Sequence, residues 1–480
     1  MSIKKEMLTG IVWSAVEKYS GVLISLFISA ILARLISPDD FGIIAVASVL
    51  INFLNIFTDM GIGSAIIQRK DLTDENLDSI FTFTLTGGII LSVVFFCLAH
   101  PIANFYKEQN LATICRILSI NLLFASLNIV PQATLLKNKL FKLIAKRTLL
   151  LQIISGAISV YAAYNGAGLY ALLISPIFTI IGMFIFNFWY SPRKLDLTFN
   201  TGPFKRIFAF SSYQFLFSFM NYFSRNIDTL IIGRSFTLTE LGYYDKSYRL
   251  MMLPLQNVTN VITPVMQPVL SSLQDNKAEL SQKYNQIIKL ISTISFPLSV
   301  FLFFTGKELI RIVYGPNWDE AIPVFRILSL SLALQMILST TGAIYQSANA
   351  TRFLFINGVS NTICAVSGFL FAAYFFHNIV SMAWAWDITL TLNMTISYII
   401  LYKIVLKSSL SAMLKLLLIP MLASLLIGIV LYSFEHYVDV SDFISLVIKF
   451  TLSVSVFFIV IQGTKHYDLI KLLKSRKQLA

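Results

Sequence analysis

The sequence predicts an all-α, polytopic membrane protein of about fourteen transmembrane helices, in two pseudo-symmetric six-helix lobes plus a C-terminal helix pair. Composition is the first reason, since 56% of the 480 residues are hydrophobic and 13% are charged. Soluble domains carry about 45–50% apolar and about 25% charged residues. The second reason is a repeat, because the tetrapeptide Arg-Ile-Leu-Ser occurs at both Arg116–Ser119 and Arg326–Ser329. The third is the distribution of lysine and arginine between the apolar segments.

Apolar segments long enough to cross a membrane recur along the chain. A hydrocarbon core about 30 Å thick needs roughly 20 helical residues to span it. The expected spans are 9–35, 42–67, 77–100, 111–136, 146–165, 168–190, 206–233, 242–271, 284–305, 320–346, 353–376, 380–402, 412–433 and 443–463.

The two halves of the chain are related by a nearly constant offset. Arg34 corresponds to Arg234 and Gly42 to Gly242, both at an offset of 200 residues. Six expected spans separate the two Arg-Ile-Leu-Ser copies, so both copies cross the membrane in the same direction and the repeat is parallel. We therefore expect an N-terminal six-helix lobe at 1–200, a second at 201–405, and the final two helices with a basic tail at 406–480.

Basic residues predict the orientation of the chain. Twenty-four lysines and arginines fall at the N-terminus and in every second connection, and five fall in the other connections. The positive-inside rule then places both termini of this multi-pass protein in the cytoplasm. The same residues explain most of the net charge of +13. Because they lie at span ends and not in one patch, no nucleic-acid partner is expected.

Enzymatic functions are disfavoured by the sequence. The longest expected outer loop, near 306–319, has about a dozen residues and cannot form a catalytic domain. The motifs of phosphate-binding loops, zinc proteases and nucleophile elbows are missing, and the four histidines and three cysteines form no ligand pattern. We therefore expect no enzyme activity, no cofactor and no metal site.

Several charged side chains fall inside the expected spans, where each costs about 2.5–3.5 kcal/mol near the bilayer centre. They should face one another or a water-filled cavity. The basic ones are Lys18, Arg116, Arg225, Lys246, Arg249, Lys289, Arg326 and Lys449, and the acidic ones are Glu17, Asp59, Asp228, Asp245 and Asp387.

Two interpretations of these charges remain open. In the first, neighbouring residues neutralise each other, as spacing permits for Arg225 with Asp228 and for Asp245 with Arg249. The alternative is an anion-binding cavity, because guanidinium and ammonium groups match the oxygens of a diphosphate. The candidate substrate-binding residues are Lys18, Arg225, Lys246 and Arg249, and the candidate ion-coupling residues, which are alternatively salt-bridge partners, are Glu17, Asp59 and Asp228.

Two further features are expected to be structural. Arg116 and Arg326 begin equivalent spans near the outer face, which favours snorkelling to the interface over substrate binding. The eighth span contains Pro254, Pro264 and Pro268, which should bend it because each lacks an amide donor.

Several motifs resemble a known family. They are Ile31–Gly42 (ILARLISPDDFG), Asp59–Gly61 (DMG), Ala65–Lys70 (AIIQRK), Asp228–Arg234 (DTLIIGR), Leu241–Tyr244 (LGYY) and Tyr314–Trp318 (YGPNW). With them the chain resembles the polysaccharide transporter family of the multidrug/oligosaccharidyl-lipid/polysaccharide (MOP) flippase superfamily, of the colanic-acid and teichuronic-acid exporter type. The resemblance implies a MATE-like fold with fourteen helices in a bacterial inner (plasma) membrane. It also implies alternating access around a cationic cavity.

The leading functional hypothesis is a flippase. Its substrate would be an undecaprenyl-diphosphate-linked oligosaccharide repeat unit, moved from the inner to the outer leaflet for surface polysaccharide biosynthesis. Lipid-linked oligosaccharide and membrane lipid are then the expected partners, with a polysaccharide polymerase and a chain-length regulator as further candidates. The alternative is a MATE-like, cation-coupled antiporter of drugs or small molecules, which would need a net-acidic cavity. The sugar, the coupling ion and the oligomeric state are left open by the sequence.

Overall fold

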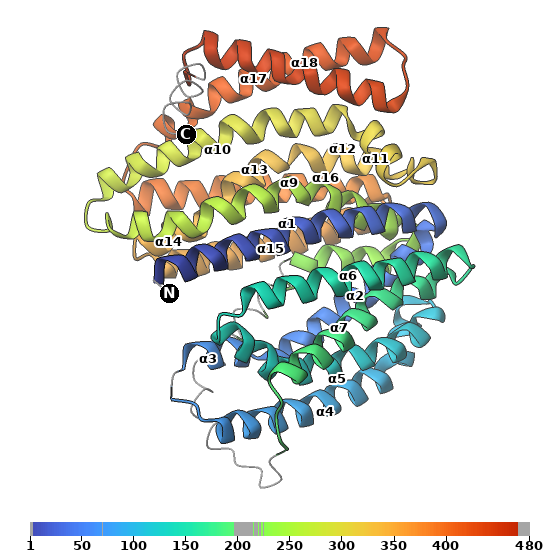
Figure 1. The fold of residues 1–480 in the computed structure, drawn as a ribbon. Helices are drawn as coiled ribbons and strands as arrows, with labels where there is room; N and C mark the ends of the chain where they lie inside the picture. Colours follow the sequence, from blue (N-terminus) through green and yellow to red (C-terminus); the bar gives the residue numbers. More distant parts are fainter. Residues whose placement is uncertain are drawn as a thin grey trace. The chain divides into compact units, whose positions relative to one another are not determined.

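The computed structural model describes residues 3–69, 71–195, 215, 219, 222–223 and 225–468, and these contain helices but no β-strand. The chain divides into two compact units, Met1–Gly242 and Tyr243–Ala480. The first unit contains α1 (Ile3–Leu35), α2 (Pro38–Asp59), α3 (Ile62–Gln68), α4 (Asp74–Tyr106), α5 (Asn110–Lys137), α6 (Phe141–Tyr164), the 3-10 turn η1 (Gly168–Tyr170) and α7 (Ala171–Tyr190) (Figure 1). The expected division at 200 and 405 stays a prediction.

The second unit contains a further series of helices. α9 (Leu238–Ser271) begins in the first unit and continues into the second. It is followed by α10 (Lys277–Phe304), α11 (Gly306–Val313), η2 (Pro316–Trp318), α12 (Ala321–Leu330), α13 (Leu332–Leu338), α14 (Thr341–Ser347), α15 (Thr351–Phe375), α16 (Ile379–Ile399), the π-helical turn η3 (Ile400–Val405), α17 (Leu410–Tyr437) and α18 (Asp442–Gly463).

The all-helical membrane fold is confirmed, and the exact span count stays a prediction. Within the described residues, 11 helices are long and apolar enough to cross a membrane, or 12 if the bent pair after Ala321 forms one span. The expected seventh span, 206–233, lies mostly outside the described residues. The eighth, α9, is one continuous helix of 34 residues but is not among the 11. Its bending at the three prolines stays a prediction.

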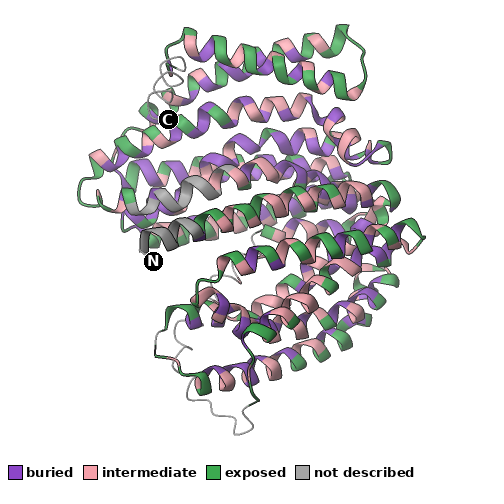
Figure 2. Ribbon diagram, viewed as in Figure 1, coloured by how far each residue is buried: buried purple, intermediate pink, exposed green. Residues whose placement is uncertain are grey.

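The exposed faces of the spanning helices are apolar, as a lipid environment requires. Figure 2 shows exposed and intermediate residues over much of α17 and α18. The exposed set on this hairpin includes Leu418, Leu425, Phe443 and Ile459, which are 62–68% exposed. A soluble protein rarely exposes so many large apolar side chains on neighbouring helices.

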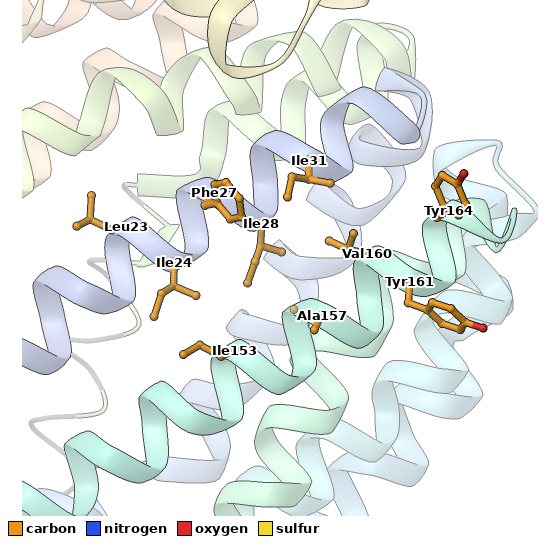
Figure 3. Close-up of a pocket in the computed structure, with 11 residues that line it drawn as sticks. Leu23, Ile24, Phe27, Ile28, Ile31, Ile153, Ala157, Val160, Tyr161 and Tyr164 are labelled. Carbon is orange, nitrogen blue, oxygen red and sulfur yellow. The ribbon is translucent and has the colours of Figure 1, made fainter.

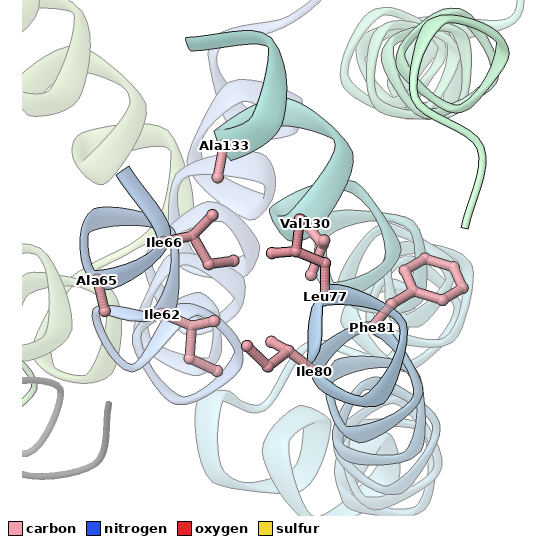
Figure 4. Close-up of a cluster of buried hydrophobic side chains, with 8 residues drawn as sticks. All are labelled: Ile62, Ala65, Ile66, Leu77, Ile80, Phe81, Val130 and Ala133. Atoms are coloured by element: carbon pink, nitrogen blue, oxygen red, sulfur yellow. The ribbon is translucent and has the colours of Figure 1, made fainter. Parts of the chain in front are cut away.

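The expected second span is broken in two. Helix α2 ends where Met60 and Gly61 adopt left-handed backbone conformations, with φ of 42° and 75°. The short helix α3 then packs Ile62, Ala65 and Ile66 into a buried cluster with residues of α4 and α5 (Figure 4). This apolar anchor holds one face of α3 in place, so the opposite face is left for polar contacts.

The expected tenth span is also broken. Helix α12 and the segment from Leu332 to Ser347 meet at an angle of 43°. At the junction the Ser331 hydroxyl donates to the carbonyl of Leu328 at 2.6 Å, and Gln335 Nε2 donates to the same hydroxyl at 2.9 Å. Serine side chains that bond back to the preceding turn loosen the backbone ladder and bend helices. Hydropathy does not report such a break.

The two Arg-Ile-Leu-Ser copies make equivalent contacts in their own units. The guanidinium of Arg116 lies 5.4 Å from the Phe96 ring, and that of Arg326 lies 5.9 Å from the Phe303 ring. Ser92 on α4 donates to the carbonyl of Ser119 at 2.6 Å, and Ser299 on α10 donates to that of Ser329 at 2.5 Å. The sequence repeat is therefore a structural repeat.

Equivalent segments also meet directly inside the first unit, where the first turns of α2 and α9 touch. A Cβ added to Gly42 would lie 1.8 Å from the Leu238 carbonyl oxygen, and one added to Gly242 would lie 2.1 Å from that of Pro38. Thr239 donates to Asp39 at 3.1 Å across the same contact, again at an offset of 200 residues. The contact is reciprocal, because each glycine of the repeat packs against backbone atoms of the equivalent segment.

The expected outer loop at 306–319 is not irregular. It forms α11 and the turn η2, which are closed by a two-point ion pair from Arg311 to Asp319 at 2.8 and 2.6 Å. Hydrogen bonds from Arg311 hold the pKa of Asp319 below its usual range. Arginine forks match carboxylates in this geometry.

Candidate functional site

A buried arginine organises a polar cluster in the first unit. Arg147 lies in α6, and only 3% of its surface is exposed. Its Nη1 atom donates to Gln132 Oε1 of α5 at 2.9 Å and to Asn187 Oδ1 of α7. Its Nη2 atom donates to the Thr148 hydroxyl at 3.2 Å. All of these partners are neutral.

The amide of Asn187 extends this cluster. Its Nδ2 atom donates to Asn128 Oδ1 at 2.7 Å and to Gln132 Oε1 at 2.8 Å. We refer to Asn128, Gln132, Arg147 and Asn187 as the Arg147 cluster. Gln132, Arg147 and Asn187 lie within about two turns of the ends of α5, α6 and α7, and Asn128 lies one turn further along α5. Helices of a membrane protein gain cohesion from such interhelical hydrogen bonds.

A polar cavity adjoins the Arg147 cluster. It has a volume of about 380 Å³ and lies between α2, α3 and α5, and we call it the α2–α5 cavity. The residues lining it are Asn55, Thr58, Asp59, Gly63, Ser64, Ile67, Ala125, Asn128, Ile129, Gln132, Ala133 and Leu136. Two members of the Arg147 cluster thus form part of its wall.

The candidate residues on α1 and α2 lie at different distances from the α2–α5 cavity and the Arg147 cluster. Asp59 lines the α2–α5 cavity, and its Oδ1 atom accepts the amide of Gly63 at 3.3 Å. Glu17 on α1 lies near enough to Arg147 for the two opposite charges to attract each other, although the described side chains of the two form no ion pair. The side chain of Lys18 is exposed. The structure therefore brings Asp59 to a cavity, Glu17 toward Arg147, and Lys18 to neither.

Arg225 and Asp228, at the end of the first unit, differ in burial. Arg225 is exposed, whereas Asp228 is 2% exposed. The Oδ1 atom of Asp228 accepts the amide of Thr229 at 2.8 Å. Most of the expected span 206–233 before them lies outside the described residues.

On α9 the predicted pairing of Asp245 with Arg249 is confirmed. Arg249 Nε donates to both carboxylate oxygens, at 2.9 and 2.7 Å. Lys246 lies between them in sequence, is buried, and has its Nζ atom 5.5 Å from the Tyr314 ring centre. Together these three side chains carry one net positive charge, and the Arg249 side chain is still 60% exposed.

Two ion pairs of the second unit, Lys449 with Glu308 and Arg326 with Glu435, were not predicted from the sequence. Lys449 on α18 and Glu308 on α11 form an ion pair of 2.6 Å with both side chains almost fully buried. The pair connects through Glu435 on α17 to Arg326, which binds Glu435 at 2.7 Å. Burial raises the pKa of Glu308, but hydrogen bonds from Lys449 and Ser445 outweigh it and leave the pKa lowered. Glu308 lay in a presumed loop, so no signal in the sequence marked it.

Arg147 was also missed, because it was counted among the basic residues of the connections although it is the second residue of the expected span at 146–165. The structure corrects this by beginning α6 at Phe141, which puts Arg147 inside the helix. The signal available was the set of isolated amides in apolar segments, Asn128, Gln132 and Asn187. Polar residues at such positions need partners.

A larger cavity of about 730 Å³ lies between α1 and α6 (Figure 3). Ile24, Ile28 and Ile153 are among its lining side chains, and the only polar side-chain atoms are the hydroxyls of Tyr161 and Tyr164. In the view, both tyrosines lie at one end of the groove. Its chemistry suits hydrocarbon, and it offers no group that would hold a phosphate or a sugar.

With this geometry in hand, comparison with known proteins identifies the family. The family described as "Polysaccharide biosynthesis protein" matches residues 31–323, which is more than half of the chain. The chain belongs to this family. Among curated relatives, the teichuronic acid biosynthesis protein TuaB of Bacillus subtilis (strain 168) is 25% identical, covering 82% of each chain. The succinoglycan biosynthesis transport protein ExoT of Rhizobium meliloti (strain 1021) is 22% identical, covering 88% of this chain and 86% of the relative.

Solved structures establish the fold. The lipid II flippase MurJ, in an inward closed conformation, superposes with a TM-score of 0.75 at 17% identity, covering 96% of this chain and all of MurJ. An inward-facing multidrug resistance transporter of the MATE family, MOP superfamily, gives 0.63 at 14% identity, covering 85% of this chain and 99% of the other. At these identities the likeness concerns the fold, and it confirms the expected MATE-like architecture.

Proposed function

We propose that this protein is a flippase that moves an undecaprenyl-diphosphate-linked oligosaccharide from the inner to the outer leaflet during surface polysaccharide biosynthesis. The observation that carries the proposal is the family match on a many-span helical fold, with relatives named for polysaccharide biosynthesis and transport. A diphosphate headgroup needs cationic partners inside the membrane. The net positive group of Lys246, Asp245 and Arg249 and the buried Arg147 supply such charge.

In the proposed mechanism, transport proceeds by alternating access around a cationic central cavity. Lys18, Arg225, Lys246 and Arg249 are the proposed substrate-binding residues, and Glu17, Asp59 and Asp228 are proposed to bind a coupling cation. The exposed side chain of Arg249, which Asp245 holds in a fixed orientation, supports a role in phosphate binding. A polysaccharide polymerase and a chain-length regulator are proposed partners.

Depletion of the protein in its host tests the function directly. Lipid-linked oligosaccharide should accumulate on the cytoplasmic leaflet, measured by its resistance to an impermeant glycosidase added to intact cells. Surface polysaccharide should fall in parallel. Normal surface glycan in depleted cells that contain no second flippase would overturn the proposal.

Two substitutions test the residues. Arg225→Ala and Arg249→Ala should each reduce export of surface glycan, because each removes a cationic donor, while the amount of protein in the membrane changes little. Lys194→Ala, an exposed residue after α7, is the matched control and should export normally. Normal export by both arginine variants would place the anion site elsewhere.

A drug antiporter is the second candidate, because the MATE transporter shares the fold. Cationic drugs require a net-acidic binding cavity, whereas the α9 group is net positive. Deletion that alters drug sensitivity and leaves surface glycan unchanged would favour this alternative over the flippase.

A further inference from the structure

The Arg147 cluster fixes which atoms face the α2–α5 cavity. A guanidinium can only donate hydrogen bonds, so Gln132 and Asn187 must turn their oxygen atoms toward Arg147. The nitrogen of Asn187 then points at Gln132 and Asn128, so Asn128 must also present its oxygen. The carboxamide nitrogens of Asn128 and Gln132 are the atoms left over. Both residues line the cavity, so its α5 wall carries two NH₂ donors.

The opposite wall of the α2–α5 cavity carries acceptors. Asn55 Oδ1 is buried and has no hydrogen-bond partner within the described part of the chain. Asp59 also lines this wall, and its Oδ1 atom accepts the amide of Gly63 at 3.3 Å. A buried acceptor without a partner is costly, and such groups in native proteins mark places where a ligand or water completes the site.

The charges around the α2–α5 cavity disfavour both a free anion and a metal ion as its ligand. A free anion would meet the Asp59 carboxylate on the α2 wall, and a metal ion would meet the NH₂ groups of the α5 wall with the Arg147 charge behind them. A ring bearing several hydroxyl groups avoids both conflicts, because each hydroxyl donates to one wall and accepts from the other. The volume of about 380 Å³ falls in the range of small-molecule sites.

We propose that the α2–α5 cavity binds a sugar ring of the transported oligosaccharide, with Asn128 and Gln132 donating to its hydroxyls and Asn55 and Asp59 accepting from them. The proposal rests on the proposed flippase function and adds a sugar subsite to it. The structural alternative is that the Arg147 cluster only holds α5, α6 and α7 together.

Two isosteric substitutions separate these roles. Asn128→Asp and Gln132→Glu keep the oxygen that accepts from Asn187 or Arg147, and each replaces the cavity-facing NH₂ with an acceptor oxygen. Gln132→Glu also brings a carboxylate to the Arg147 guanidinium, which has neutral hydrogen-bond partners in the native protein, and Asn128→Asp brings one to the Asn187 amide that bonds Arg147. A purely structural cluster should therefore tolerate or gain from these changes, whereas a sugar site should lose its donors.

Saturation-transfer difference NMR on the full chain in lipid nanodiscs measures the binding. The probes are the methyl glycosides of glucose, galactose and N-acetylglucosamine at millimolar concentration. We expect transfer to at least one glycoside in the native protein. Its affinity should fall about three- to tenfold in Asn128→Asp and in Gln132→Glu, since each loses one hydrogen bond. Thermal unfolding of both variants should match the native protein or exceed it.

The control for the glycoside-binding experiment is a variant of the Arg147 cluster's surroundings that leaves the cavity lining unchanged. Thr148→Val removes a partner of Arg147 outside the cavity, and it should bind the probe like the native protein. Absence of transfer to all three glycosides, or native affinity in both isosteric variants, would overturn the proposal. Displacement of the glycoside by sodium ions would assign the cavity to a cation and overturn it as well.

The glycoside-binding experiment and the depletion experiment can fail independently, so the sugar site and the flippase function are tested separately. Glycoside binding that depends on Asn128 and Gln132, in a protein whose depletion leaves surface glycan intact, would retain the sugar site and reject the flippase. Accumulation of lipid-linked oligosaccharide on depletion, with native glycoside affinity in both variants, would retain the flippase and reject only the sugar site.

Discussion

At the scale of single residues, the ion pair of Lys449 with Glu308 shows how charge is tolerated in the second unit. The Nζ atom of Lys449 also donates to the carbonyl of Phe304 at 2.7 Å, and Ser445 donates to Glu308 at 2.6 Å. Both ions are therefore paired and hydrogen-bonded, which is the condition for keeping buried charge. The pair joins the C-terminal helix α18 to α11 in the same unit.

Lys449→Met should destabilise the protein strongly at neutral pH, by about 3–5 kcal/mol, because it leaves the Glu308 carboxylate buried without a cation. In the native protein the lowered pKa of Glu308 gives stability that is present above about pH 4.3 and is lost as pH falls through the folded-state pKa. In the variant the Lys449 cation and its hydrogen bond are gone, so burial outweighs the remaining hydrogen bond from Ser445 and raises that pKa. Its stability should then fall as pH rises through the raised pKa, measured as thermal unfolding in detergent between pH 5 and pH 8.

The double variant Lys449→Met with Glu308→Gln is the control. Removing the second charge should recover much of the loss and abolish the reversed pH dependence, because no buried ion remains. A single variant as stable as the native protein at pH 8 would contradict the structural role of the pair.

At the scale of elements, the contact of α2 with α9 depends on glycine. Gly42→Ala would place a Cβ where the Leu238 carbonyl lies 1.8 Å away, and backbone atoms cannot retreat as a flexible side chain can. We expect a loss of about 1–3 kcal/mol from this overpacking, seen as a lower unfolding temperature and less protein in the membrane.

Gly87→Ala on α4 is the matched control, because a Cβ there meets no atom within 4 Å. It should be neutral or slightly stabilising, since alanine favours a helix over glycine. Equal stability of the two variants would argue against a close contact at Gly42. Gly242→Ala should resemble Gly42→Ala, because the repeat makes the contact reciprocal.

At the scale of the whole molecule, orientation is open to a direct test. Lys107 follows α4 and Lys194 follows α7, at opposite ends of the helices of the first unit. In a variant with Cys97, Cys115 and Cys364 replaced by serine, an impermeant maleimide should label Lys107→Cys in intact cells. It should label Lys194→Cys only after permeabilisation, because the positive-inside rule puts that end in the cytoplasm. The reverse pattern would invert the predicted topology.

Much of the fold could be predicted from the sequence, but less of the candidate site could be. Long apolar runs and the offset between the halves predicted the helical architecture, because both signals are read from neighbouring residues. Breaks at Gly61 and Ser331 were missed, since a kink changes backbone geometry without changing hydropathy. The pairing of Asp245 with Arg249 was predictable because the two lie one helical turn apart.

The sequence by itself determined a duplicated, many-span helical protein with its positive charge at the ends of the spans. Tertiary structure alone decided which polar side chains meet. Arg147 and Asn187 lie 40 positions apart, and Ser445 and Glu308 lie 137 apart. The physical reason is that hydropathy and helix periodicity are local properties, whereas partners on different helices are chosen by how the helices pack. Packing also brought Arg147 to the amides around it, two of which, Asn128 and Gln132, form part of a cavity wall.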